Sequence, residues 1–220
     1  MKETQLIQLK IHLLGISPQI YRKFVVCDTT TIAQLHHLIQ IIMGWKGYHL
    51  HQFHIFGKYY GIYYSGGMSF SSNPFEVTLS SFDFSKGDKF TYCYNFYDNW
   101  KHEIRIEKLT SLPADYQCPK VLEGKRACPL EDIGGAERYQ QAIINQHCWM
   151  YEWACYLAEC LETNEVPKLD ADSFPYWYLT HRSEEYNKAK INGAIEKLYQ
   201  QKGDCSFWRN LRDYYDFLEE

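Results

Sequence analysis

Three short blocks of the sequence hold most of the side chains that could do chemistry: residues 44–53, 92–103 and 124–135. The polar candidates in these blocks are imidazoles and carboxylates, namely His49, His51, Asp98, His102, Glu131 and Asp132. Side chains of these types bind divalent metals and move protons in general acid–base catalysis. The sequence therefore predicts a polar cluster, provided that the fold brings the three blocks together.

Strand phase indicates which of these side chains point inward. In an extended segment His51 shares a face with Phe53, and by the same phase His102 shares a face with Ile104. A buried imidazole needs a hydrogen-bond partner, because an unsatisfied polar group in a core costs about 1–3 kcal/mol. The expected partners are the carboxylates Asp98, Glu131 and Asp132.

A metal-dependent hydrolase is one function that this cluster suggests. If a metal binds, the set best placed to converge from separate strands is His51, Asp98 and His102. His49 and His51 place both rings on one face of a strand, but this spacing alone is weak and no familiar metal motif is present. We expect no cofactor, with a divalent metal as the alternative.

A binding module is the other function that the blocks suggest. Its groove would be lined by the aromatic rings of Trp45, Tyr94 and Trp100, beside the polar cluster. Exposed aromatic rings stack on nucleic-acid bases, so a nucleic acid is an expected partner, as is a protein or peptide. The formal net charge of −4 counts against nucleic acid. Aromatic residues at such positions are also common in cores.

Cys128 is a third candidate. A thiol beside Pro129 becomes a nucleophile if it pairs with His102, and it serves equally well as a buried residue that closes a turn. Residues 131–135 have a structural alternative too, since acids are favoured at the start of a helix and glycines supply unusual backbone angles there.

The length of 220 residues fits one domain with an appendage. Residues 1–5 lead into a strand without the apolar stretch of a signal peptide. No apolar run approaches the roughly 18 residues of a membrane helix. We therefore expect a cytoplasmic protein with no membrane partner, whose eight cysteines are mostly reduced and buried.

Periodicity predicts the elements of the N-terminal half. Residues 6–13 and 20–26 alternate as two strands of an antiparallel hairpin. Residues 31–43 form an amphipathic helix, which begins with a capping box at Thr31 and Gln34 and ends at the following glycine.

The next strand, 48–56, has apolar residues on both faces and is expected inside the sheet rather than at its edge. Residues 57–73 predict a hairpin followed by a loop. Two further strands, over 90–96 and 103–107, follow it.

Helical spacing dominates after residue 135. It predicts one or two helices up to Leu161, a linker over 170–178, a helix over 183–200 and a last helix over 207–218. Strands with one helix, followed by helices, are typical of the α+β class. We predict a mostly antiparallel sheet with one packed helix in the N-terminal half and a helical C-terminal part.

Four motifs stand in the order of a known family. They are Ile20-Tyr21-Arg22; Leu35-His36 and Ile39-Gln40 with Gly44-Trp45 and His49-Leu50-His51-Gln52-Phe53; Tyr94, Phe96, Asp98, Trp100, His102 and Glu103; and Gly124 to Pro129 with Glu131 to Gly135 and Tyr139. With them the sequence resembles the plasmid pRiA4b ORF-3-like family, whose members are often carried on plasmids and transposable elements. The resemblance covers about residues 4–178. It implies a family domain over 1–178, and we expect residues 179–220 to form a helical extension packed on it.

Three positions depart from the family pattern. Asn95 stands where the family usually has aspartate, Tyr97 where it has glycine, and Leu130 where it often has a second proline. If the family's aspartate binds a metal or acts as a base, Asn95 weakens that role, because an amide cannot take a proton and binds a cation less well.

The resemblance implies no settled activity. We therefore predict a non-catalytic binding or accessory module linked to plasmids or transposable elements. The alternative is a metal-dependent hydrolase that uses the His, Asp and Glu cluster, so the sequence leaves open whether the protein is an enzyme.

Overall fold

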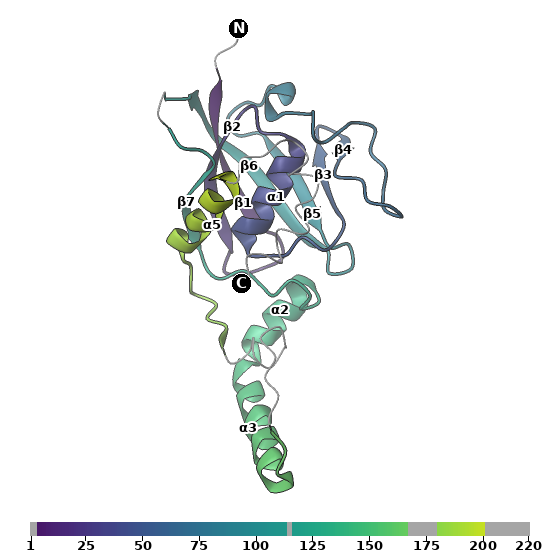
Figure 1. The fold of residues 1–220 in the computed structure, drawn as a ribbon, viewed down its shortest axis with the longest axis vertical. Coiled ribbons are helices and arrows are strands. Elements are labelled where there is room, and N and C mark those ends of the chain that lie inside the picture. Colours follow the sequence, from purple (N-terminus) through teal and green to yellow (C-terminus); the bar gives the residue numbers. More distant parts are fainter. Residues whose placement is uncertain (1–3, 114–115, 167–179, 201–220) are drawn as a thin grey trace.

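A computed structural model describes residues 4–113, 116–166 and 180–200 (Figure 1). Seven strands form one sheet in the order β4-β3-β5-β6-β1-β2-β7. Every pair of neighbouring strands is antiparallel. The predicted combination of helices with an antiparallel sheet is thus confirmed.

The strands are β1 Gln5–Leu13, β2 Tyr21–Cys27, β3 His51–Ile55, β4 Lys58–Tyr60, β5 Lys89–Tyr94, β6 Trp100–Ser111 and β7 Lys120–Lys125. The helices are α1 Ile32–Met43, α2 Gly135–Ile144, α3 Gln146–Thr163 and α5 Lys188–Gln200, with a short 3-10 turn at Leu79–Phe82.

The hairpin of β1 and β2 lies at the centre of the core. Leu9 in β1 is opposite Phe24 in β2 and Ile106 in β6, and all three side chains are buried. Side chains alternate along a strand, so the neighbouring Gln8 and Lys10 turn to the other, more exposed face. One face of the sheet therefore carries the core and the other is polar.

Helix α1 lies across the buried face of the sheet (Figure 1). Its first turn has the predicted capping box: Thr31 Oγ1 accepts from Gln34 N at 3.2 Å, and Gln34 Oε1 accepts from Thr31 N at 2.9 Å. Gly44 ends the helix with a φ of 78°, a conformation that glycine adopts at little cost. These local signals fix where the loop that carries Trp45 begins.

Two elements differ from the sequence-based expectation. Strand β7 was not predicted, because its sequence contains little apolar alternation and only Val121 is fully buried. Helix α5 begins at Lys188 instead of residue 183. Just before it, Tyr186 packs its ring over Arg22, and Asn187 Oδ1 accepts from Lys190 N at 2.9 Å, which caps the helix at this later position.

Strand β3 has neighbours on both sides, β4 and β5, as predicted for an interior strand. Its observed length is shorter than 48–56. The predicted linker over 170–178 and the predicted helix over 207–218 lie outside the described residues.

The helices of the second half take two directions. Helices α2 and α3 extend away from one end of the sheet, whereas α5 returns to it (Figure 1). There α5 packs against β7 and α1. No helix in the described part of the chain is long and apolar enough to cross a membrane.

A disulfide joins Cys27, at the end of β2, to Cys118, just before β7. The other described cysteines with free thiols are Cys93, Cys128, Cys155 and Cys160. The four free thiols agree with the expectation that the cysteines are mostly reduced, but of these four only Cys160 is buried, contrary to expectation. The disulfide ties the edge strand β7 to the sheet.

Candidate functional site

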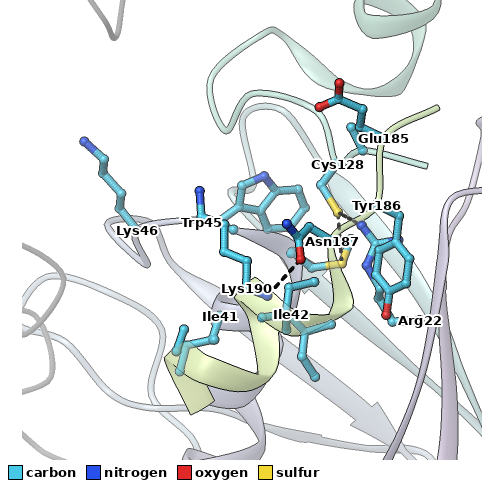
Figure 2. Close-up of a pocket in the computed structure, with 15 residues that line it drawn as sticks. Arg22, Ile41, Ile42, Trp45, Lys46, Cys128, Glu185, Tyr186, Asn187 and Lys190 are labelled. Atoms are coloured by element: carbon cyan, nitrogen blue, oxygen red, sulfur yellow. Dashed lines mark hydrogen bonds between the residues drawn. The ribbon is translucent and has the colours of Figure 1, made fainter. Parts of the chain in front are cut away.

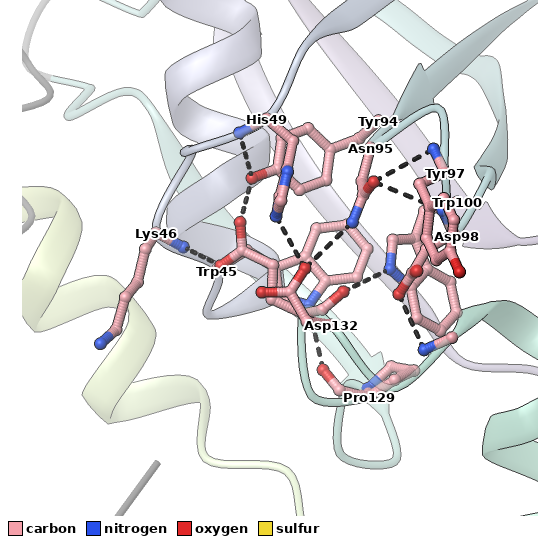
Figure 3. Close-up of polar contacts among 12 residues, drawn as sticks. Trp45, Lys46, His49, Tyr94, Asn95, Tyr97, Asp98, Trp100, Pro129 and Asp132 are labelled. Atoms are coloured by element: carbon pink, nitrogen blue, oxygen red, sulfur yellow. Dashed lines mark hydrogen bonds and ion pairs between the residues drawn. The ribbon is translucent and has the colours of Figure 1, made fainter. Parts of the chain in front are cut away.

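The fold brings the three predicted blocks together at the end of the sheet near α2 (Figure 3). Two tryptophans hold the third block to the other two. Trp45 Nε1 donates to Pro129 O at 3.0 Å, and Trp100 Nε1 donates to Glu131 O at 2.8 Å. The predicted convergence of the blocks is therefore observed.

Glu131 is the buried carboxylate at the centre of this junction. Its Oε2 accepts from the backbone N–H of Lys46 at 2.7 Å, and its Oε1 accepts from the hydroxyl of Tyr94. Both donors belong to the other two blocks. Each carboxylate oxygen therefore has a donor from within the chain, and Glu131 links the third block to the first and second by hydrogen bonds.

Asp98 and Asn95 shape the turn between β5 and β6. Asp98 Oδ2 accepts from Gly134 N at 2.9 Å, and Asn95 Oδ1 accepts from the backbone N–H groups of Tyr97 and Asp98 at 3.2 and 3.3 Å. Asn95 has a φ of 51°, which asparagine tolerates better than most residues. At this position the family usually has aspartate, and here the amide of Asn95 closes the turn.

His49 and Asp132 form the outer edge of the cluster. His49 Nε2 lies 2.7 Å from Asp132 Oδ1, which also accepts from Asn95 Nδ2 at 3.1 Å. The side chains of His49 and Asp132 are 34% and 65% exposed, whereas the other four predicted polar residues are buried. Only this pair of the six reaches solvent.

The buried imidazoles form a separate group between α1 and the sheet. The rings of His36 and His51 stack with centroids 3.5 Å apart. His36 Nδ1 lies 2.8 Å from the hydroxyl of Tyr92, and His51 Nε2 accepts from Ile62 N at 3.2 Å. These contacts replace the carboxylate partners that the sequence analysis expected.

His102 is fully buried, as its strand phase predicts. Its Nδ1 lies 3.3 Å from Tyr92 O, so its partner is a backbone carbonyl instead of Asp98, Glu131 or Asp132. Burial lowers the pKa of His102 and that of His51 to about 3, and it lowers the pKa of His36 well below its ordinary value. All three rings are therefore neutral at ordinary pH.

The structure does not assemble the predicted metal set. His51 lies in the group beneath α1, whereas Asp98 is engaged with Gly134 at the turn. Within the described ranges, no group of three or more His, Cys, Asp or Glu side chains is placed to hold a metal ion.

The three aromatic residues predicted to line a groove lie in the interior instead. Trp45 is 3% exposed, and Tyr94 and Trp100 are completely buried. The ring of Trp45 lies 5.3 Å from that of Tyr94 and 5.5 Å from that of Trp100. Their packing gives the junction of the three blocks an aromatic core, in line with the frequent use of aromatic residues in protein cores.

A pocket of about 660 Å³ opens on the other side of Trp45, beside the last turn of α1 and the first turn of α5 (Figure 2). Figure 2 shows Trp45 and Lys190 on one side of it and Arg22 with Tyr186 on the other. Cys128 also lines this space. Segments far apart in the sequence therefore build one cavity.

Arg22 is held rigidly at the wall of the pocket. Its Nη1 donates to the carbonyls of Tyr21 and Lys125, both at 2.8 Å, and its Nη2 donates to Arg126 O at 2.8 Å. The ring of Tyr186 covers the guanidinium, 4.6 Å from Cζ. These contacts fix the side chain, which is only 3% exposed.

Two neighbours complete this wall. A Cβ atom on Gly124 would lie 2.7 Å from Arg22 Cδ and from the Tyr186 ring, so glycine makes room for both side chains. Cys128 Sγ accepts from Arg22 Nη2 at 3.1 Å and lies 3.7 Å from Met43 Sδ. The contacts of Cys128 thus differ from the thiol–imidazole pair with His102 that was considered above.

Burial raises the pKa of the Cys128 thiol, although the nearby charge of Arg22 acts in the opposite direction. The thiol form is therefore favoured. Arg22 was not among the site residues predicted from the sequence. Its signal was an arginine between Ile20 and Phe24 on the apolar face of a strand, where a charge needs a specific reason.

Comparisons with known proteins place these features in context. The profile of the family described as plasmid pRiA4b ORF-3-like protein matches residues 5–147. The uncharacterized protein y4hQ of Sinorhizobium fredii (strain NBRC 101917 / NGR234) is 31% identical over 143 residues, which are 63% of this chain and 71% of that protein. The crystal structure of MM3350, a protein of unknown function from Methanosarcina mazei Go1, is similar with a TM-score of 0.62 and 25% identity, covering 85% of this chain and 97% of that one.

Proposed function

The chain belongs to the plasmid pRiA4b ORF-3-like family, and we propose that it is a non-catalytic binding module, an accessory protein of plasmids or transposable elements. Its binding site is the pocket between Arg22, Trp45 and Tyr186. This location differs from the groove of Trp45, Tyr94 and Trp100 beside the polar cluster that was predicted from the sequence, and it shares only Trp45 with it.

One observation carries the proposal: the polar cluster is committed to internal contacts, whereas the pocket is open. Glu131 and Asp98 accept from backbone N–H groups of other blocks, at 2.7 and 2.9 Å. A carboxylate that already holds two chain segments together is poorly placed to bind a substrate or exchange a proton. The cluster instead fixes the loop of Trp45, which forms part of the pocket wall.

The side chains around the pocket support binding rather than catalysis. Among the described residues that line it, none is a histidine, the most common general base, and the one carboxylate, Glu185, is exposed to solvent. Its one thiol, Cys128, is partnered by Arg22 and has a raised pKa. A nucleophile needs the opposite conditions, a lowered pKa or an adjacent base.

Blocking the pocket tests the proposal. Ala194 lines it from α5, and Ala194→Phe fills part of it with an aromatic ring. Ala189 is an exposed residue of the same helix, so Ala189→Phe is the matched control. Wild type and both variants are screened by thermal shift against mixed neutral, cationic and anionic small molecules.

We expect at least one class of molecule to raise the melting temperature of wild type and Ala189→Phe but not of Ala194→Phe. Compounds that stabilise all three proteins alike, or none of them, would contradict the pocket as the binding site. Hydrolysis of ester or phosphodiester substrates that disappears in His49→Ala/Asp132→Ala would instead support the hydrolase alternative.

A further inference from the structure

We infer that the pocket beside Arg22 takes a small organic carboxylate with an apolar body. The inference rests on the proposed function, because it names the ligand class of that same site. It follows from a buried charge without a counter-charge, from the other charges of the lining, and from the apolar walls.

Arg22 is a buried cation that forms no ion pair with a carboxylate of the described residues. Three of its four hydrogen bonds go to backbone carbonyls and the fourth to the sulfur of Cys128, so every acceptor is uncharged. Its Nε has no hydrogen-bond partner among the described residues. Burying a charge is costly unless an opposite charge is near. An anion in the adjacent pocket would supply that charge.

The rest of the lining strengthens the positive field. Lys190 lines the pocket together with Arg22, against one carboxylate, Glu185. This excess of cations contrasts with the formal net charge of −4 for the whole chain. Helix α5 also begins here, and the positive end of its dipole adds to the attraction for an anion.

The remaining walls are apolar. Ile41, Ile42 and Met43 come from the last turn of α1, and Ile191 and Ala194 come from α5. The volume of about 660 Å³ lies within the roughly 300–1,000 Å³ of typical small-molecule sites. A ligand that places an alkyl or aryl group on these walls would bury it while its charged end faces Arg22 and Lys190.

A carboxylate fits this arrangement better than a phosphate. The Nη hydrogen bonds of Arg22 are already used by backbone carbonyls, so few fixed donors remain for an anion. A phosphate ester carries about two charges and three strong acceptor oxygens, all of which need partners when water is removed. A carboxylate carries one charge and two oxygens, which fewer donors satisfy.

The test is calorimetric titration of the full chain with octanoate, octanol and octyl phosphate. Octanoate is expected to bind about tenfold tighter than octanol, because only the acid gains from the buried cation. Ala194→Phe should abolish the binding and Ala189→Phe should keep it. Trileucine with a free carboxyl terminus, compared with its amide, shows whether the carboxylate can belong to a peptide end.

Charge variants of α5 test the electrostatic part without touching the buried Arg22. Lys190→Gln should weaken octanoate about fivefold and leave octanol unchanged. Lys197 is exposed near the other end of the same helix, so Lys197→Gln is the matched control and should bind octanoate within about twofold of wild type.

The outcomes separate the two claims. Octanol as tight as octanoate, with both blocked by Ala194→Phe, would overturn the carboxylate and leave the pocket as a binding site. Tighter binding of octyl phosphate, or equal effects of Lys190→Gln and Lys197→Gln, would also overturn the carboxylate. If no molecule of any class is blocked by Ala194→Phe, the proposed function fails as well.

Discussion

His36 of α1 and His51 of β3 stack with their ring centroids 3.5 Å apart and their planes within 7° of parallel. Both rings are buried, and burial lowers the pKa of each. Two imidazoles in such contact are not both protonated at once, because two positive charges at this separation would repel strongly. The stack therefore ties the packing of α1 on the sheet to pH.

Acid should destabilise the protein through these rings. In the folded chain the pKa values of His51 and His102 are about 3, against an ordinary 6.5. As the pH falls below 6.5 the unfolded chain takes up protons that the folded chain does not, so the free energy of unfolding decreases. Each such histidine contributes about 1.4 kcal/mol per pH unit. Urea denaturation between pH 7 and pH 4.5 measures this slope.

A matched pair of variants identifies the source of that slope. His51→Gln keeps an acceptor for Ile62 N. It should reduce the slope of the unfolding free energy against pH by the contribution of one proton, about 1.4 kcal/mol per pH unit. His54 is exposed on the same strand, so His54→Gln is the matched control for the substitution itself. Equal slopes in wild type and His51→Gln would show that the imidazole of His51 titrates normally in the folded state.

Removing the Glu131 carboxylate, which links the three blocks, should lower the free energy of unfolding. Glu131→Ala takes away the acceptor of both Lys46 N and the Tyr94 hydroxyl, at a cost of about 2–4 kcal/mol. Asp132→Ala is the control, because that side chain is 65% exposed and its pairing with His49 is worth less than about 1 kcal/mol. Chemical denaturation at pH 7 compares the two. Similar losses of stability in both variants would contradict the distinction between the buried hydrogen bonds of Glu131 and the surface pair of His49 and Asp132.

Gly124 should be the more sensitive of two glycines near the pocket. A Cβ at this position would crowd Arg22 and Tyr186 at 2.7 Å, so Gly124→Ala should displace the Tyr186 ring and lower stability by about 1–3 kcal/mol. At Gly193 in α5 nothing lies within 4 Å, and Gly193→Ala should stabilise the helix by about 1 kcal/mol. Thermal denaturation of the two variants shows whether each melting temperature rises or falls. Two variants that shift the melting temperature in the same direction would contradict the packing at Gly124.

The disulfide should add stability, because it closes a long loop. Cys27 and Cys118 are 91 residues apart, and a cross-link over such a span removes much of the freedom of the unfolded chain. Reduction with dithiothreitol should lower the free energy of unfolding by about 2–4 kcal/mol. The double variant Cys27→Ser/Cys118→Ser should be as stable as the reduced protein and insensitive to the reductant. An equal response of wild type and double variant would show that this bond is not the cause.

Local signals in the sequence predicted most of the N-terminal half. The Thr31 and Gln34 box places the start of α1, and the alternation of β1 and β2 gives their hairpin and their buried faces. Such signals act within a few residues, so they can be recognised without knowledge of the fold. Strand β7 gave no such signal, because its place is set by pairing with β2.

The candidate site was only partly predictable for the same reason. The phase of β3 and β6 correctly places His51 and His102 inside, but phase does not say which partner lies opposite a buried ring. The partners come from Tyr92, Ile62 and α1, which the sheet register and the helix packing bring near. The expected carboxylates are instead used between the three blocks.

The pocket was missed because its walls come from distant segments. Arg22 lies in β2, Trp45 follows α1, and Tyr186 precedes α5. No spacing rule connects these positions. The one available signal was local, a charged side chain on the apolar face of β2.

The central claim is that ligands bind in the pocket and not at the polar cluster, and nuclear magnetic resonance tests it most directly. Isotope-labelled protein is titrated with octanoate, and the perturbed signals are assigned. We expect the largest changes at Ile41, Ile191 and Ala194 in the pocket lining, with little change at His49 and Asp132. Changes centred on His49 and Asp132, or no localised change at all, would contradict the account.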